Sequence, residues 1–394
     1  MTLQEKIGQR LMTGFPGTEM TEEFRRVVKE HKIGNVILFR ENIRDRAQLK
    51  RLCGEIQELV RQETGHSAFI AIDQEGGSVT RFPADAVNVP GAMALGASGD
   101  PENAYRAGML IGREMRALGP NFNFAPTVDV NSNPKNPVIG VRSYGDDPHM
   151  VGRYAAQSVR GLLEGGVLCT AKHFPGHGDT DVDSHLGLPC VDKSLEELDE
   201  SVNRILEYKA RWIEGEQSCD FDFAAAAEES RRMLEQTITE LSRPAAGKLS
   251  LKEPLCIGCE PYWASLVGNV DERQGNPFGV QMTEELGGAC ADMERNPSPE
   301  AIAALVERAK EHGCAVVGTF NAYVNPGQLE LIRALADGGV STAEVALRSP
   351  CDLRDLPEGV WAIAAYEYSP GSIRAAAKVL RGDLQPTGKL PVRL

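Results

Sequence analysis

The densest group of chemically useful side chains in this chain lies between residues 172 and 185. The stretch holds three histidines, three aspartates and a lysine, in the order Lys172-His173-Phe174-Pro175-Gly176-His177-Gly178-Asp179-Thr180-Asp181-Val182-Asp183-Ser184-His185. It follows the apolar run 166–171, which is typical of a buried strand. Because α/β enzymes present catalytic groups on loops that follow buried strands, this stretch is a candidate catalytic loop.

Two kinds of chemistry suit these side chains. Asp183 and His185 are two residues apart, so the carboxylate can bind one imidazole nitrogen and leave the other for general acid/base catalysis. The alternative is a metal site, for which the candidate ligands are His173, His177, Asp179, Asp183 and His185. A solvated polar loop without chemistry is the third interpretation. The chain has no GxSxG motif, so a serine nucleophile elbow is not indicated.

The first half of the chain alternates apolar runs with amphipathic stretches. We expect strands at 8–14, 34–39, 68–72, 121–125 and 167–171, and helices at 21–31, 46–63, 101–118 and 148–164. Repeated strand–helix units of this length predict a parallel sheet. Polar residues directly follow four of the strands, at Arg40, Asp73, Asp129 and Lys172. This arrangement favours a (β/α)8 TIM-like barrel with its site on the rim formed by the carboxyl ends of the strands.

The pattern changes near residue 200. Residues 198–212 and 223–241 are predicted to be long helices, and 247–254 resembles a linker. Strands are then expected at 255–258, 279–282, 315–318 and 340–347, with helices at 299–312 and 328–336. The predicted organisation is a barrel-like domain at 1–212, a helical linker at 213–250 and a smaller α/β sandwich domain at 251–394.

Composition narrows the class of protein. The 394 residues carry a formal net charge of -14, which argues against a nucleic acid or an anionic membrane as partner. The N-terminus does not resemble a signal peptide, and no apolar run has the length that a bilayer requires. The nine scattered cysteines favour reduced thiols. We therefore expect a cytoplasmic protein.

Several motifs together resemble glycoside hydrolase family 3, in particular its two-domain bacterial β-N-acetylglucosaminidases. The loop continues as Leu186-Gly187-Leu188-Pro189, and the other matching stretches are 72–81 (IDQEGGSVTR), 123–130 (NFAPTVDV), 138–145 (VIGVRSYG), 349–353 (SPCDL), 365–366 (AY) and 386–392 (PTGKLPV). The motifs occur in the family's order and span most of the chain.

The resemblance implies roles for individual residues. Asp183 and His185 fall on an Asp–His dyad that serves as the family's acid/base group, and Asp73, Arg81, Arg142, Lys172 and His173 match residues that bind sugar hydroxyls. From the residues alone, Arg142 could instead pair with a rim carboxylate, and Lys172 could brace Asp129. Ser78 stands where many relatives have another arginine, which weakens contacts around the rim.

One expected part is absent from the sequence. A retaining glycosidase needs a second carboxylate to attack the anomeric carbon, and the family carries it on a later barrel strand. Here 191–198 resembles the segment after the loop and 199–206 the final barrel helix, so about 90 residues, or three βα units, are missing after residue 198. A sheet opened after its fifth strand must be closed by another chain, be capped by the helices at 198–241, or fold poorly.

The resulting expectation is an incomplete barrel of about five strands followed by the α/β sandwich domain. By resemblance the chain is a β-N-acetylhexosaminidase that acts on GlcNAc-containing glycans in peptidoglycan recycling, without a cofactor or metal, and impaired by loss of the nucleophile. The alternatives are an inactive sugar-binding pseudoenzyme, a metal-dependent hydrolase or a phosphorolytic variant. The expected partner is a carbohydrate, and a homo-oligomer is one way to close the barrel.

Overall fold

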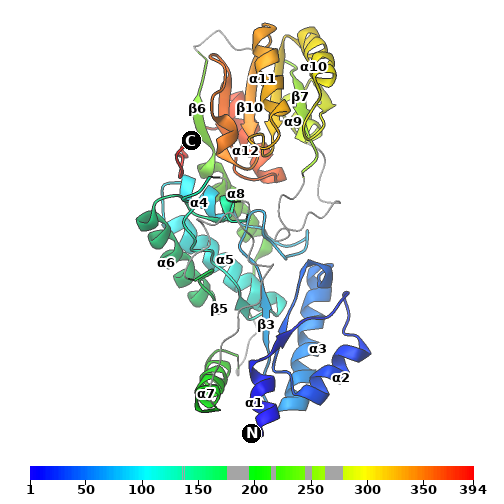
Figure 1. Ribbon diagram of the computed structural model, residues 1–394, viewed down its shortest axis with the longest axis vertical. Coiled ribbons are helices and arrows are strands. Elements are labelled where there is room, and N and C mark those ends of the chain that lie inside the picture. Colours follow the sequence, from blue (N-terminus) through cyan, green and yellow to red (C-terminus); the bar gives the residue numbers. More distant parts are fainter. Residues whose placement is uncertain (135, 137, 175–194, 214–218, 245–250, 262–277) are drawn as a thin grey trace.

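The computed structural model describes residues 1–134, 136, 138–174, 195–213, 219–244, 251–261 and 278–394. The described chain forms two sheets with their helices, arranged one after the other along a long axis (Figure 1). The N-terminus lies at one end of the molecule and the second sheet at the other (Figure 1).

The first sheet has five parallel strands in the order β1-β2-β3-β4-β5. The strands are β1 Met12–Thr13, β2 Asn35–Ile37, β3 Phe69–Ile72, β4 Phe122–Asn123 and β5 Leu168–Cys169. Each lies within one of the five predicted segments, which confirms the parallel α/β sheet. Only residues 170–194 separate β5 from the next helix, fewer than the roughly 90 residues that three further βα units take.

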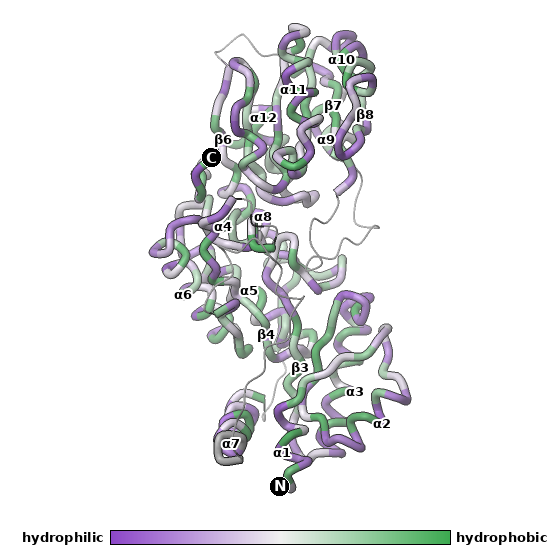
Figure 2. The backbone as a smooth tube through the Cα atoms, viewed as in Figure 1, coloured by the Kyte–Doolittle hydropathy of each residue, from purple (hydrophilic) through white to green (hydrophobic). Residues whose placement is uncertain are grey.

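The helices of this part are amphipathic, and in Figure 2 their chain alternates between green apolar and purple polar stretches. They are α1 Leu3–Arg10, α2 Glu22–His31, α3 Arg46–Thr64, α4 Ala92–Ala97, α5 Glu102–Leu118 and α6 Pro148–Glu164, with short 3-10 turns η1 Arg40–Asn42 and η2 Gly140–Arg142. Helix α3 shows why they form. Asp45 caps its first turn by accepting from the Gln48 amide, and Gly65 ends it with φ 75°. Its buried face, which includes Leu49, Ile56 and Val60, packs into the main core.

Helix α7, Leu195–Trp212, packs beside α1 and contacts the first residues of four strands of the five-stranded sheet. Sheet residues Met12, Phe69, Phe122 and Leu168 form one apolar cluster with Leu163, Ile205, Trp212 and Ile213. Lys209 of α7 is buried, and its ammonium donates to the Gln9 Oε1 at 2.8 Å and to the Gly34 carbonyl at 2.9 Å. Among the described residues, contact by α7 agrees with capping by helices, one of the three outcomes expected for an opened barrel.

The second sheet has six strands in the order β6-β11-β10-β9-β7-β8, all parallel except β6 at the edge. Its strands are β6 Thr239–Ser242, β7 Leu255–Gly258, β8 Ala289–Asp292, β9 Cys314–Thr319, β10 Ser341–Ala346 and β11 Trp361–Ala364. Its helices are α8 Phe223–Thr237, α9 Phe278–Leu286, α10 Pro299–His312, α11 Gly327–Asp337, η4 Pro350–Leu353 and α12 Pro370–Arg381. This confirms the smaller α/β domain, with α9 packed beside α12 and α10 beside α11.

Two local predictions in this part are wrong. Residues 239–241, expected at the end of the helix 223–241, lie in β6 of the second sheet. Residues 279–282, expected as a strand, lie in α9. The reason is the buried pair Phe278 and Met282, which are four residues apart and so share one helix face.

An apolar cluster joins the two parts of the chain. Its members from the first part are Met93, Ala94, Ala97 and Val141, and those from the second include Ala346, Leu353, Ala364 and Tyr366. Hydrogen bonds cross the same boundary, including one from the Arg393 amide to the Asp146 carboxylate at 2.9 Å. Among the described helices, none has both the length and the apolar character that crossing a membrane requires.

Candidate active site

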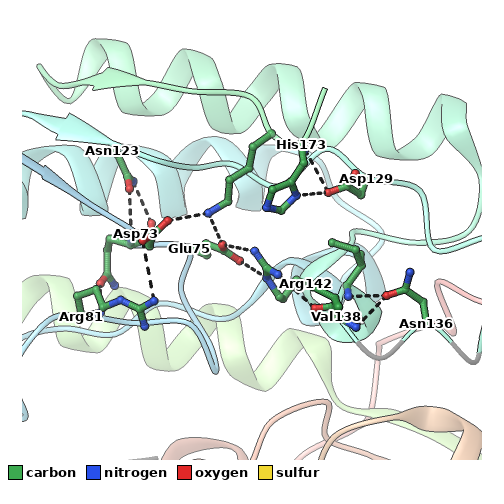
Figure 3. A network of polar contacts seen from close by, with 12 residues as sticks. Asp73, Glu75, Arg81, Asn123, Asp129, Asn136, Val138, Arg142 and His173 are labelled. Atoms are coloured by element: carbon green, nitrogen blue, oxygen red, sulfur yellow. Dashed lines mark hydrogen bonds and ion pairs between the residues drawn. The ribbon is translucent and has the colours of Figure 1, made fainter. Parts of the chain in front are cut away.

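The polar residues predicted to follow the strands meet at one edge of the first sheet, because the carboxyl ends of parallel strands lie together. Asp73 follows β3, Asp129 lies beyond β4, and Lys172 and His173 lie beyond β5. Backbone pairing continues past the strands, since the Val128 amide donates to the Lys172 carbonyl at 2.6 Å. Figure 3 shows these side chains converging from separate elements.

Glu75 is the centre of the charge network. Its carboxylate receives both the Nε and Nη2 of Arg142, at 2.9 and 2.8 Å, in a two-pronged contact. The ammonium of Lys172 lies 2.6 Å from the same carboxylate. Such paired, charge-assisted contacts fix the direction of both cationic side chains.

Burial and charge act against each other at Glu75. Burial opposes its ionisation, but the positive charges of Lys172 and Arg142 and their hydrogen bonds outweigh it and lower the pKa to about 2. The Arg142 pKa is raised, because the carboxylates of Glu75, Asp73 and Asp129 outweigh the effect of burial. Glu75 and Arg142 are therefore both ionised throughout the neutral pH range.

Asp73 is the second carboxylate of the network. It accepts from the Lys172 ammonium at 2.9 Å, and an Arg81 Nη2 lies 3.9 Å from its other oxygen. Burial lowers the pKa of Arg81, although the Asp73 and Glu75 charges oppose this. Lys172 thus bridges Asp73 and Glu75, two carboxylates of the loop that follows β3.

His173 is held by Asp129. The Nδ1 of His173 lies 2.7 Å from the Asp129 carboxylate, whose side chain is fully buried, and the His173 backbone amide donates to the same oxygen at 3.2 Å. An ionised carboxylate can only accept, so the contact places a proton on Nδ1 and fixes the imidazole's orientation.

Exposure separates residues that can touch a ligand from residues that support them. The side chains of Arg142, Arg81 and Glu75 are only 5–7% exposed, whereas those of Lys172, Asp73 and His173 are 13%, 20% and 35% exposed. The open face of the network therefore consists of an ammonium, a carboxylate and an imidazole. Donors and acceptors of this kind suit a neutral, hydroxyl-rich ligand.

Two supporting side chains shape the β3 loop from within. Asn123 and Gln74 exchange two hydrogen bonds. The Gln74 backbone amide donates to the Asn123 side-chain oxygen at 3.0 Å, and the Asn123 side-chain amide donates to the Gln74 backbone carbonyl at 2.9 Å. The Gln74 side-chain oxygen accepts from the Thr80 hydroxyl and from the Arg81 and Phe82 amides. Sequence reasoning missed this role, and the only signal was the position of both residues directly after or within a strand.

The five predicted binding residues occupy one region, but they do not all share one role. Arg142 pairs with a rim carboxylate, Glu75, as the simpler interpretation held, and Lys172 binds Asp73 and Glu75 rather than Asp129. The predicted catalytic residues Asp183 and His185 lie outside the described residues. So do His177 and Asp179 of the metal alternative; within the described ranges no group of three or more His, Cys, Asp or Glu side chains is placed to hold a metal.

The fold and the sequence together identify the family. Residues 2–210 match the sequence profile of the glycosyl hydrolase family 3 N-terminal domain, which is more than half of the chain. The chain therefore belongs to glycoside hydrolase family 3. The resemblance inferred from the motifs is confirmed.

Individual relatives agree with this assignment. A β-hexosaminidase A from Pseudoalteromonas piscicida is 39% identical over 221 residues, which cover 51% of this chain and 37% of that protein. A β-hexosaminidase from Photobacterium profundum is 28% identical over 342 residues, covering 86% of this chain and 90% of the relative. The chain spans only 37–55% of the length of several of the curated relatives that it matches.

Solved structures show the same two-part architecture. A glycoside hydrolase family 3 β-N-acetylglucosaminidase from Paenibacillus sp. str. FPU-7 aligns with a TM-score of 0.86 and 29% identity, covering 100% of this chain and 99% of that one. The arrangement of a parallel five-stranded sheet followed by a mixed six-stranded sheet thus matches two-domain members of the family.

Proposed function

We propose that this chain binds the terminal GlcNAc of cell-wall-derived glycans at the rim of its first sheet, as a β-N-acetylhexosaminidase-type glycosidase of family 3. The observation that carries the proposal is the cluster of Lys172, Asp73 and His173, held in place by Glu75 and Asp129 and partly open to solvent. Each open group can exchange hydrogen bonds with sugar hydroxyls while the ion pairs behind it stay intact. The β-hexosaminidase relatives point to the same substrate class.

In the proposed mechanism, Asp183 orients His185, and His185 gives a proton to the leaving oxygen and later takes one from water. A retaining mechanism also needs a carboxylate nucleophile about 5 Å away. The family places it on a later barrel strand, and the 25 residues between β5 and α7 (170–194) are far fewer than the roughly 90 that three further βα units take. We infer that turnover is impaired while sugar binding is kept, in a protein that acts in the cytoplasm.

Isothermal calorimetry with GlcNAc tests the binding. Wild-type protein is expected to bind at millimolar concentration, and Lys172→Ala at least about tenfold more weakly, because a hydrogen bond to a charged group is lost. Lys32→Ala is the matched control, since Lys32 forms a comparable ion pair with Glu63 away from the rim. Equal affinity in both variants, or no heat with wild-type protein, contradicts the proposal.

A chromogenic GlcNAc β-glycoside tests the impaired turnover. The expected result is release at or near the background rate. Turnover by the wild-type chain that His185→Ala abolishes would show instead that a working nucleophile is present.

A further inference from the structure

The second domain reaches the rim of the first sheet through the residues that follow β11. Glu367 is 6% exposed, and its Oε1 accepts a hydrogen bond from the Gly91 amide at 2.8 Å. A cavity between the domains is lined by Glu75 and Arg142 from the first and by Tyr366 and Glu367 from the second. The Glu367 carboxyl group of the second domain therefore lines the same cavity as the buried ion pair of Glu75 and Arg142.

The backbone around Glu367 explains how it touches the β3 loop. A Cβ atom on Gly77 would lie 2.7 Å from the Gly91 Cα and 3.3 Å from the Glu367 Oε1, so these two glycine backbones and the carboxyl group are in contact. Gly77 is also bonded to the segment just before Gly91, because its backbone amide donates to the Val89 carbonyl at 2.8 Å. The loop that carries Asp73 and Glu75 thus packs against Gly91, and Glu367 fixes Gly91 by accepting its backbone hydrogen bond.

A second contact leads from the same domain to Arg142. Val141 packs in the apolar cluster that also holds Ala346 and Tyr366 of the second domain. Arg142 is the next residue, and its carboxylate partner is Glu75 on the loop beside Gly77. Both partners of the central ion pair are therefore supported by the second domain.

We propose that Glu367 is a positioning residue for the sugar site, which fixes the loop 73–79 through Gly91 and so sets the direction in which Glu75 holds Arg142 and Lys172. The proposal rests on the function proposed above and deepens it: the second domain completes the GlcNAc site from behind, without itself touching the sugar.

The charge state of Glu367 gives this role a pH dependence. Burial raises its pKa to about 7, although hydrogen bonds from Gly91 and Ser369 oppose the shift. The titratable and charged side chains that share its cavity are Glu75, Arg142, Tyr144 and Tyr366. Arg142 is already neutralised by Glu75. Ionisation of Glu367 above neutral pH therefore places a negative charge in a site whose burial disfavours it, and we expect it to loosen the loop.

Hydrogen exchange of the ligand-free protein tests the positioning directly. In Glu367→Ala, amides in 73–91 are expected to exchange about fivefold to tenfold faster, the change that loss of one buried hydrogen bond gives, while those in α10 stay unchanged. Glu367→Gln keeps the acceptor and should match wild type at pH 6, then exchange more slowly than wild type at pH 8. Glu344→Gln is the matched control, since it removes another buried carboxyl of the second domain that bonds Thr319.

The outcomes separate the two proposals. Faster exchange in 73–91 for Glu367→Ala alone, with GlcNAc affinity reduced by a similar factor, supports the positioning role. Unchanged exchange in 73–91 for Glu367→Ala, or an equal increase in Glu344→Gln, overturns it. Absence of GlcNAc binding by the wild-type protein refutes the proposed function, while the exchange result still decides whether Glu367 positions the loop.

Discussion

Glu75 differs from the other charged residues of the rim because it serves two cations at once from a buried position. Its side chain is 7% exposed, and it contacts both Arg142 and Lys172. Removing one member of a buried ion pair leaves an uncompensated charge, which costs far more than removing an exposed pair. Glu75 is therefore the residue of the network with the largest predicted effect on both stability and binding.

We predict that Glu75→Gln lowers the free energy of unfolding by roughly 3 kcal/mol, because the buried Arg142 loses its counter-charge and Lys172 keeps only Asp73. GlcNAc binding should be lost with it. Urea denaturation at pH 7 measures the change. Glu63→Gln is the control, since Glu63 pairs with Lys32 at a more exposed site and should cost at most about 1 kcal/mol. Equal losses in the two variants would contradict a central role for Glu75.

The pH dependence of this contribution has a defined sign. The pKa of Glu75 in the folded protein, about 2, lies below its ordinary value of 4.5. Its stabilisation is therefore fully present above pH 4.5 and is lost as the pH falls toward 2. The difference in stability between wild type and Glu75→Gln should shrink over that acidic range alone.

The sequence indicated the members of this site better than their pairing. Asp73, Asp129 and Lys172 could be placed on one rim because parallel strands end at one edge, and the family resemblance added Arg142 and His173. Which carboxylate each cation would bind was not predictable, since Glu75 and Arg142 are 67 residues apart and their contact depends on how η2 folds over the rim. Burial, which separates supporting from open residues, likewise comes only from packing.

At the scale of elements, helix α7 supplies apolar side chains that contact the five-stranded sheet. Ile205, Trp212 and Ile213 pack on sheet residues from β1, β3, β4 and β5. The helix also brings the ammonium of Lys209 to within 5.2 Å of the Phe69 ring. The helix itself was predictable from its apolar periodicity. Its place on the sheet was not, because that place depends on the strands missing from the sequence.

We predict that Ile213→Ala destabilises the protein by about 2–4 kcal/mol, since it leaves a cavity between α7 and the sheet. Loosening this contact exposes the apolar sheet residues Met12, Phe69 and Phe122. The variant should therefore also self-associate more strongly, which sedimentation velocity measures. Tyr208→Ala is the control within α7, which Ile213 directly follows, as Tyr208 is 43% exposed. Similar behaviour of the two variants would mean that α7 does not cover the sheet in solution. A homo-oligomer that closes the barrel stays a prediction, tested by the wild-type sedimentation profile.

Other elements show where sequence patterns mislead. Residues 279–282 carry the apolar alternation of a strand, yet they form a helix. Phe278 packs against the backbone of Gly258 and Gly318. A Cβ atom added to either glycine would lie only 2.6–2.7 Å from the Phe278 side chain. Those two glycines make room for a helix on the sheet. Their effect is tertiary, so the local pattern could not reveal it.

At the scale of the whole molecule, burial outweighs the favourable contacts of several carboxyl groups. Burial raises the pKa of Glu114 to about 8 and of Asp352 and Glu367 to about 7, and that of Glu344 well above its ordinary value. They lie in both parts of the chain. Each is protonated in the folded protein at a pH where the unfolded chain has released the proton.

We predict that the protein is most stable near pH 5 and loses stability as the pH rises to 8.5. A raised pKa in the folded state contributes stability that is fully present below about pH 4.5 and lost as the pH rises through 7 to 8, at about 1.4 kcal/mol per pH unit for each proton. Thermal unfolding between pH 5 and 9 measures the trend. The net charge of -14 acts in the same direction through self-repulsion, but added salt screens that part and leaves the buried carboxyls unaffected. Glu114→Gln should flatten the curve between about pH 4.5 and 8 at every salt concentration, because over that range the unfolded wild-type chain has released the Glu114 proton while the folded protein keeps it. A Tm that rises with pH, or a fall that 0.5 M salt abolishes, would show that these carboxyls do not control the stability of the molecule.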